Sequence, residues 1–150
     1  MSKTRNSEVY KKNSFYHLYN RGNRKALIFH NDDDYETFKR LMYRYLKKSH
    51  VLLITYCYMP NHYHFVLKCG NDWQEIPRFM QSFMTGYALY FNRKYRKVGR
   101  LFQGPFQIRR IIGKRDLEST IEYIKRNPLE LPSMKNHIES EYPWLYVRQR

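Results

Sequence analysis

The chain has 150 residues, which is long enough to bury the core of one domain without disulfide bonds. It carries 28 Lys and Arg against 13 Asp and Glu, and the resulting formal charge of +15 indicates a polyanionic partner. No apolar run approaches the roughly 20 residues that span a bilayer, and the N-terminus lacks the apolar core of a signal peptide, so we expect no membrane partner and a cytoplasmic location.

The first half of the chain predicts a strand, a helix and two further strands. Residues 1–13 are polar and basic and are expected to form a flexible arm, after which the aromatic run 14–22 predicts the first strand. Residues 31–50 begin with Asn and three Asp and carry apolar residues at intervals of three and four, which is typical of a capped helix. The apolar runs 51–59 and 62–69 then predict two strands joined by a short turn.

The second half of the chain predicts a helix, a strand and a last helix. Residues 74–95 place apolar side chains at helical spacing, which predicts a long helix packed against the core. Residues 102–112 are expected to hold a strand, and residues 114–127 a helix that ends before Pro128. The remaining residues, 129–150, are expected to form an irregular tail.

This order of elements predicts an α+β fold. Two amphipathic helices must lie on one face of a small antiparallel sheet to bury their apolar stripes, which resembles a ferredoxin-like layout. The last helix is expected near the other face of the sheet. All 150 residues are therefore expected to form a single domain.

Two histidines stand close together in the stretch "YMPNHYHFVL". Side chains alternate along a strand, so His62 and His64 share one face, while Tyr63, Phe65 and Leu67 point to the core on the other. The two imidazoles would lie about 6 to 7 Å apart, close enough to converge on one divalent ion. The strand alone leaves open whether the pair binds metal or simply faces solvent.

The last helix offers a third candidate ligand and a candidate nucleophile. Leu117, Ile121 and Ile124 predict its buried side, whereas Tyr123 and Asn127 lie one turn apart on a polar side. Among the 15 tyrosines of the chain, only Tyr123 has a carboxamide four residues further on within a predicted helix. Tyr123 is thus either an ordinary surface residue of an amphipathic helix or a nucleophile that attacks a phosphodiester beside a metal ion.

A stretch of residues 93–115 contains nine cations and no acid, which indicates a track for the phosphates of DNA. If part of this stretch is a strand, Arg109 and Arg110 point to opposite faces, so only one of them can join the track there. The aromatic content of 17% supplies rings on which bases could stack. The candidate DNA-binding residues are Arg21, Arg93, Lys94, Arg96, Lys97, Arg100, Arg109, Arg110, Lys114 and Arg115.

Several of these segments together resemble a known family. "YCYMPNHYHFVL" is similar to the His-hydrophobic-His segment of the HUH single-tyrosine transposases, and "YIKRNP" is similar to their nucleophile helix. "YNRGNRK", "DDDYETF", "FMQSFMTGYALYFNRKY" and "LFQGPF" follow the same order, so the resemblance covers roughly residues 14–130. The branch it resembles is that of the REP-associated tyrosine transposases, relatives of the insertion-sequence-200-like enzymes. The resemblance implies that Tyr123 is the nucleophile and that His62, His64 and Asn127 are the metal ligands.

The resemblance also implies an activity. Members of the family cut single-stranded DNA near a hairpin, leave a 5′-phosphotyrosine and a free 3′-hydroxyl, use Mg²⁺ or Mn²⁺, and work as monomers or homodimers. A nucleoid-associated cytoplasmic transposase is therefore expected. Imidazole ligands suit Mn²⁺ better than Mg²⁺, and Zn²⁺ is a further alternative for the bound ion. The sequence departs from the family pattern at Tyr63, where an aliphatic residue is commoner, and at Pro105, where Arg is common.

Two other functions are compatible with this composition. A domesticated protein could keep the fold and bind structured nucleic acid without cutting it, although all four residues of the implied site are present. A plain ferredoxin-like RNA-binding domain would place aromatic residues on the exposed sheet face, where this chain has His62 and His64.

Overall fold

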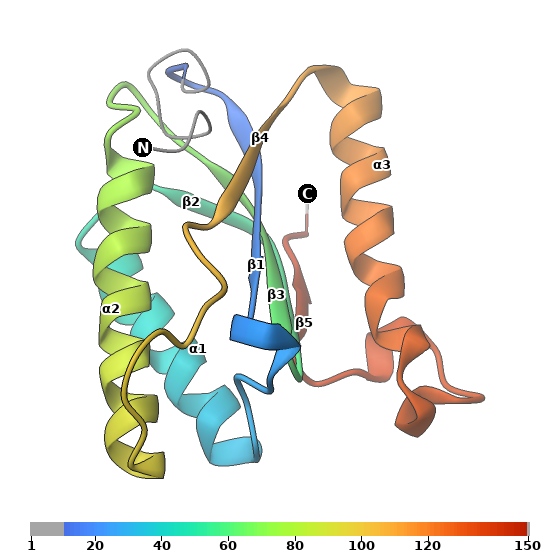
Figure 1. Cartoon of the computed structure of the whole chain (residues 1–150). Coiled ribbons are helices and arrows are strands. Elements are labelled where there is room, and N and C mark those ends of the chain that lie inside the picture. Colours follow the sequence, from blue (N-terminus) through green and yellow to red (C-terminus); the bar gives the residue numbers. More distant parts are fainter. Residues whose placement is uncertain (1–10, 150) are drawn as a thin grey trace.

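The computed structural model describes residues 11–149 and contains one antiparallel sheet with helices on both of its faces (Figure 1). In chain order, the main elements are β1 (Phe15–Arg21), α1 (Asp32–Lys47), β2 (Leu52–Met59), β3 (His62–Lys68), α2 (Glu75–Tyr95), β4 (Gln107–Ile111), α3 (Gly113–Arg126) and β5 (Leu145–Val147). The spatial order of the strands is β4-β1-β3-β2-β5. The first four strands with α1 and α2 form the expected ferredoxin-like α+β unit.

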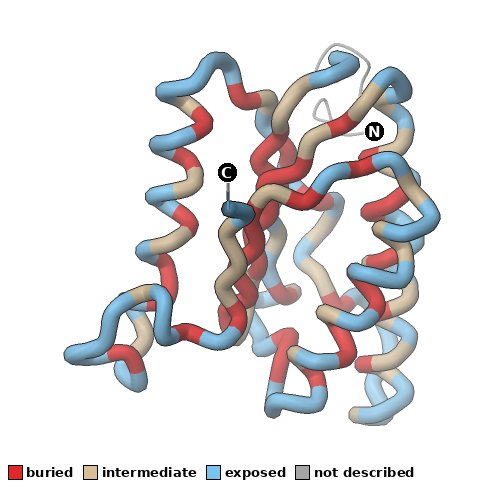
Figure 2. The backbone as a smooth tube through the Cα atoms, turned by 180° about the vertical axis from the view of Figure 1, so that it is seen from behind, coloured by how far each residue is buried: buried red, intermediate tan, exposed pale blue. Residues whose placement is uncertain are grey.

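Helices α1 and α2 cover one face of the sheet and close the main core (Figure 1). Phe38 of α1 lies at the centre of this core, where its ring centroid is 4.5 Å from that of Phe83 on α2 and 4.7 Å from that of Tyr58 on β2. Figure 2 shows the buried positions along the strands and on the sides of the helices that face them. As the sequence predicts, each strand and helix of this unit buries one face against the core. This burial explains the alternation in the strands and the helical spacing in α1 and α2.

Helix α1 begins as its sequence predicts. The side chain of Asn31 accepts a hydrogen bond from the backbone N–H of Asp34, at 3.1 Å, and three aspartates occupy the first turn. These contacts fix the start of the helix and place Asp34 at its inner side, where it is fully buried.

Helix α3 lies on the opposite face of the sheet from α1 and α2 (Figure 1). On the side of α3 that faces the sheet, Leu117 and Ile124 are buried and Ile121 is partly buried, as predicted for the apolar side of this helix. The helix ends at Arg126 and continues into the short 3₁₀ helix η3 (Asn127–Glu130). The expected position of the last helix is therefore confirmed.

The fourth strand is shorter than predicted and starts at Gln107. Phe102 forms an isolated bridge with Gly22, and the N–H of Gln103 donates a hydrogen bond to the last residue of β1, at 2.9 Å. Residues 103–106 lie outside the strands, and Pro105 among them has no N–H to offer a neighbouring strand. Residues 96–106 together form the loop between α2 and β4.

The prediction of an irregular tail is wrong at its end. After three short 3₁₀ helices, the chain forms β5, which pairs with the outer edge of β2. The tail is held by Tyr142, whose hydroxyl donates to the carbonyl of Tyr58, at 2.6 Å, and by Trp144, which stacks on Tyr35 with 4.8 Å between ring centroids. A strand of three residues is too short to show alternation in the sequence.

At the other end of the chain, residues 1–10 of the expected flexible arm lie outside the described residues. The last residues of that arm are bonded to the fold, since the N–H of Asn13 donates to the carbonyl of Gly70, at 2.8 Å. Among residues 11–149, no helix has the length and apolar character needed to cross a membrane.

Candidate active site

The two histidines of β3 lie on the sheet face that α3 covers. Their ring centroids are 5.2 Å apart and the ring planes are perpendicular. His64 is buried and His62 is half-buried, whereas Tyr63 and Phe65 are fully buried on the opposite face. The predicted division of this strand into a core face and a histidine face is confirmed.

His62 lies between two amide oxygens. Its Nδ1 atom is 2.7 Å from Oδ1 of Asn61, and its Nε2 atom is 3.1 Å from Oδ1 of Asn127. Both amides are oriented by bonds that their own NH₂ groups donate, from Asn61 to the carbonyl of Lys25 and from Asn127 to the carbonyl of Tyr123. The imidazole of His62 therefore has an acceptor at each nitrogen.

His64 has a partner that the sequence did not reveal. Nδ1 of His64 lies 3.0 Å from Nε2 of His17, a buried residue of β1. Burial lowers the pKa of His64 to about 3, helped by His17 and His62 and opposed by a hydrogen bond with Asn127. Burial likewise lowers the pKa of His17 to about 4, with a further contribution from the positive charge of Arg109. Both imidazoles are therefore neutral at pH 7.

Tyr123 projects from α3 over these histidines. Its ring centroid lies 5.7 Å from that of His64 and 6.3 Å from that of His17, in edge contacts. Tyr123 is 58% exposed, so its hydroxyl remains open to a substrate. Its carbonyl accepts the bond from Asn127 one turn later, which ties the two residues of the predicted pair together. A single chain thus brings the candidate nucleophile and the candidate ligands to one place.

Helix α3 is held in this position by an ion pair at its first turns. Arg109 of β4 contacts both carboxylate oxygens of Asp116, at 2.9 and 3.1 Å, and also donates to the hydroxyl of Thr120. The hydrogen bonds from Arg109 and from the N–H of Ile112 lower the pKa of Asp116. Thr120 is buried, and this contact joins it to the sheet. Arg109 therefore positions α3, in addition to its predicted role in DNA binding.

The contacts of His62 suit a metal site. In its neutral form, the imidazole carries one proton, which can serve only one of the two acceptors, Asn61 and Asn127. A proton on Nδ1 serves Asn61 and leaves the Nε2 lone pair facing the oxygen of Asn127, an arrangement that a cation would satisfy. Within the described part of the chain, no three His, Cys, Asp or Glu side chains gather as a metal site, so the third protein ligand would be an amide. His62, His64 and Asn127 fit a divalent ion with nitrogen and oxygen ligands.

These residues line a cavity of about 1030 Å³. Its wall includes the three histidines and Tyr123, and the cations Arg21, Lys25 and Arg109 outnumber the acid Glu130. Polar groups of the loop between α2 and β4 complete the wall. The other lining residues are Tyr19, Asn20, Asn61, Gln103, Gly104, Pro105, Gln107 and Asn127. Lys25 was missed as a candidate contact, although it belongs to the segment "YNRGNRK" that carries part of the family resemblance.

The predicted DNA-binding residues are divided between this cavity and the outer surface. Arg21 and Arg109 line the cavity, and Arg21 also bonds to Gln103 in the wall. Arg110 faces away from Arg109, as expected for neighbours in a strand. The remaining predicted residues lie at the C-terminal end of α2, in the loop that follows it, or in the first turn of α3: Arg93, Lys94, Arg96, Lys97, Arg100, Lys114 and Arg115. DNA contacts at these outer positions stay predictions.

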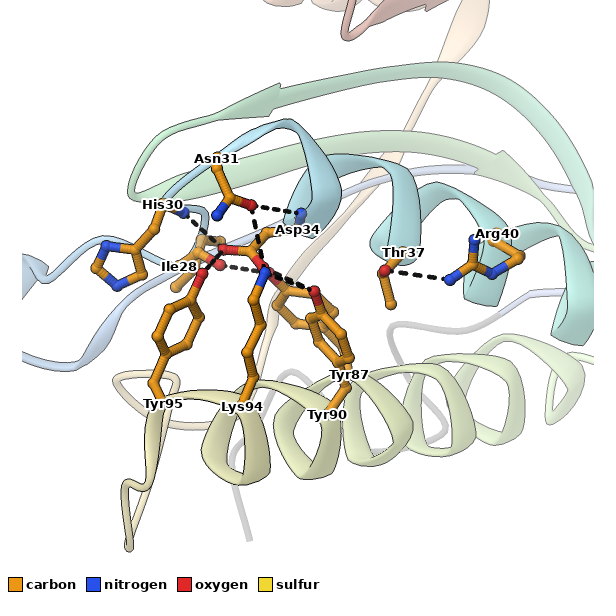
Figure 3. Close-up of polar contacts among 10 residues, drawn as sticks. All are labelled: Ile28, His30, Asn31, Asp34, Thr37, Arg40, Tyr87, Tyr90, Lys94 and Tyr95. Carbon is orange, nitrogen blue, oxygen red and sulfur yellow. Dashed lines mark hydrogen bonds and ion pairs between the residues drawn. The ribbon is translucent and has the colours of Figure 1, made fainter.

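Lys94 has a structural partner. Its ammonium group bonds at 2.8 Å to the fully buried carboxylate of Asp34, which also accepts hydrogen bonds from Tyr90, Tyr95 and the N–H of His30 (Figure 3). Burial alone would raise the pKa of Asp34, but these hydrogen bonds outweigh it and lower the pKa. The bond to Asp34 raises the pKa of Lys94. Lys94 therefore joins the end of α2 to the start of α1.

Comparison with known proteins bears directly on this site. A family model described as IS200-like transposase matches residues 10–127, which includes all four residues of the candidate site. The chain belongs to the IS200-like transposase family. The predicted resemblance is thereby confirmed at the level of the family. No curated protein matches this transposase.

Two solved structures share the fold of this transposase. A REP-associated tyrosine transposase bound to a REP hairpin superposes with a TM-score of 0.75, at 16% sequence identity, over 97% of this chain and 82% of that one. A candidate transposase from Deinococcus radiodurans R1 superposes with a TM-score of 0.54, at 15% identity, over 92% of this chain and 99% of that one. At such identities the likeness is one of fold.

Proposed function

We propose that this transposase cleaves and rejoins single-stranded DNA next to hairpins through a 5′-phosphotyrosine at Tyr123, as a member of the REP-associated branch. The observation that carries the proposal is the convergence of Tyr123, His62, His64 and Asn127 on one wall of the cavity. The hairpin bound to the structure with the same fold supports the choice of substrate.

The residues of the site have distinct parts in this reaction. His62, His64 and Asn127 would hold Mg²⁺ or Mn²⁺, which when bound polarises the scissile phosphate and stabilises its developing charge. The phenol oxygen of Tyr123 attacks the phosphorus, a bond from phosphorus to this oxygen forms, and the bond to the 3′-oxygen breaks. The phenol gives up its proton to water and the leaving 3′-oxygen takes one up. Attack by a 3′-hydroxyl on the phosphotyrosine reverses the step and rejoins DNA.

The cations of the cavity suit a nucleic-acid backbone. Arg21 and Lys25 lie at the end of β1 and just after it, on the side of the cavity where His62 begins β3. A groove with several cations and one acid attracts phosphates and makes binding depend on salt. Tyr19, which is 40% exposed beside His64, adds a ring on which a base can stack.

A covalent-adduct experiment tests the proposal. Wild-type protein is incubated with labelled hairpin DNA that carries a single-stranded extension and with Mn²⁺, and the products are separated under denaturing conditions. We expect an adduct with wild type and with the control Tyr43→Phe, which changes another exposed tyrosine, and none with Tyr123→Phe. Hairpin binding should persist in all three proteins.

Two results would contradict the proposal in different ways. An adduct formed by Tyr123→Phe would exclude Tyr123 as the nucleophile. Hairpin binding by wild type without any adduct would favour the second function, a domesticated protein that binds structured nucleic acid without cutting it.

A mass measurement in solution would decide between monomer and homodimer.

A further inference from the structure

The buried contact between His17 and His64 has no part in the reaction described above. The two rings come from neighbouring strands, β1 and β3, and lie nearly stacked with 5.2 Å between centroids. The 3.0 Å separation of their nitrogens is that of a hydrogen bond. A buried hydrogen bond between two neutral imidazoles has one donor and one acceptor, so it couples the tautomer of one ring to that of the other.

We propose that His17 is a positioning residue of the metal site: its Nε2 atom accepts the Nδ1 proton of His64 and so directs the Nε2 lone pair of His64 toward Asn127. This inference rests on the proposed function, because it assumes that His64 is a metal ligand. A histidine that binds metal through one nitrogen commonly donates the proton of its other nitrogen to an outer partner, which fixes its tautomer and orientation.

The arrangement around His62 supports this assignment. Nδ1 of His62 faces the amide oxygen of Asn61, and its Nε2 faces Asn127. In the same way, Nδ1 of His64 faces His17, while Asn127 also interacts with the ring of His64. Each candidate ligand therefore has a hydrogen-bonding partner at Nδ1, and Asn127 contacts both rings. The opposite tautomer of His64 would put a proton where a cation must bind.

The position of His17 suits the role of an acceptor. His17 is 8% exposed, so water does not compete freely for the bond. Arg109 of β4 lies opposite His17 in the pairing of β1 with β4, and a neutral His17 ring can accept a hydrogen bond at Nε2. Arg109 itself is held by Asp116 and Thr120, so the same contacts that hold α3 also define the surroundings of His17.

Nitrogen NMR of the wild-type protein gives the first test. In ¹⁵N-labelled, metal-free protein at pH 7, we expect His64 to carry its proton on Nδ1 and to show a coupling across the hydrogen bond to Nε2 of His17. A proton on Nε2 of His64 would overturn the proposal. This measurement needs no variant, so a folding defect cannot obscure it.

Binding of Mn²⁺, followed by electron paramagnetic resonance, gives the second test. His17→Phe keeps a ring but has no acceptor, and we expect its affinity for Mn²⁺ to fall 10- to 100-fold, the usual effect of losing an outer partner. His17→Gln carries an oxygen that can accept the same proton and should recover part of the affinity. His30→Phe, which removes an exposed imidazole that packs on Phe91 away from the cavity, is the matched control.

The outcomes separate the role of His17 from the proposed function. If wild type binds Mn²⁺ and His17→Phe binds it within twofold of wild type, His17 only fills space and the inference fails alone. If wild type binds no Mn²⁺, or binds it equally after His62→Ala, the metal site fails and both proposals fall. Urea unfolding of each variant distinguishes lost stability from lost affinity.

Discussion

The amide oxygen of Asn127 lies 3.1 Å from Nε2 of His62, although 65 positions separate the two residues in the chain. The NH₂ group of the same amide donates a hydrogen bond to the carbonyl of Tyr123. This bond orients the amide so that its oxygen faces His62. Asn127 therefore joins the end of α3 to His62 of β3, and its replacement removes the oxygen ligand of the proposed metal site.

The first prediction follows from this contact. Asn127→Ala should weaken Mn²⁺ binding by more than about 10-fold, since loss of a ligand costs at least as much as loss of an outer partner. The control is Asn92→Ala, which removes an amide bonded to the carbonyl of Gly99 at the end of α2. Equal Mn²⁺ affinity in the two variants, measured by paramagnetic resonance, would show that Asn127 is no ligand.

The second prediction concerns the ion pair that holds α3. Asp116→Ala frees Arg109, so Tyr123 should lose its fixed position and adduct formation should slow by about 10- to 100-fold, the effect of a displacement of about 1 Å. Hydrogen exchange in α3 should become faster. Glu118→Ala, which removes an exposed acid of the same helix, is the control. Wild-type adduct rates in Asp116→Ala would mean that burial of Leu117 and Ile124 alone positions the helix.

The third prediction concerns the cations of the cavity. Arg21→Ala should lower the slope of the logarithm of DNA affinity against the logarithm of salt concentration by about 0.7, the contribution of one phosphate contact on a single strand. Lys135→Ala, an exposed cation outside the cavity wall, serves as the control. The slope is measured by titrations of a fluorescent oligonucleotide at several salt concentrations, and identical slopes for both variants would place the DNA elsewhere.

The fourth prediction concerns pH and the carboxylate of Asp34. Its pKa is lowered in the folded state, so its contribution to stability is present above the unfolded value of 3.8 and is lost as pH falls through the lower folded pKa. Asp34→Asn should lower the free energy of unfolding by about 2 kcal/mol at pH 7, because the hydrogen bonds from Tyr90, Tyr95 and the N–H of His30 lose their charged, buried acceptor. The difference from wild type should shrink below pH 3.8. Urea unfolding across this range checks it, with the exposed Asp33→Asn as control.

The fifth prediction concerns the turn beside His62. A Cβ atom on Gly22 would lie 2.0 Å from the carbonyl oxygen of Ala26, so the backbone must shift to admit it. Gly22→Ala should lower the free energy of unfolding by about 1 to 3 kcal/mol. Gly70→Ala, where a Cβ atom meets nothing within 4 Å, should stay within about 0.5 kcal/mol of wild type in the same urea titration. Equal stability of both variants would show that the turn adapts.

Local patterns in the sequence were enough to predict much of the fold and the central part of the site. Alternation in β3 separates His62 and His64 from the core residues beside them, because neighbouring side chains of a strand point to opposite faces. Helical spacing places Tyr123 and Asn127 one turn apart, because a turn takes 3.6 residues. These periodicities are properties of the backbone within one element, so they can be read without knowledge of the partner elements.

Contacts between elements were decided only by the tertiary structure. The register of β1 against β3 brings His17 next to His64. The packing of α3 against β4 allows Arg109 to form an ion pair with Asp116. The association of α1 with α2 buries Asp34 against Lys94, so a cation predicted to bind DNA has an internal partner. No local pattern specifies such pairs, because strand register and helix packing depend on burial summed over the whole chain. The sequence by itself therefore determined which residues share a face, and tertiary packing determined which faces meet.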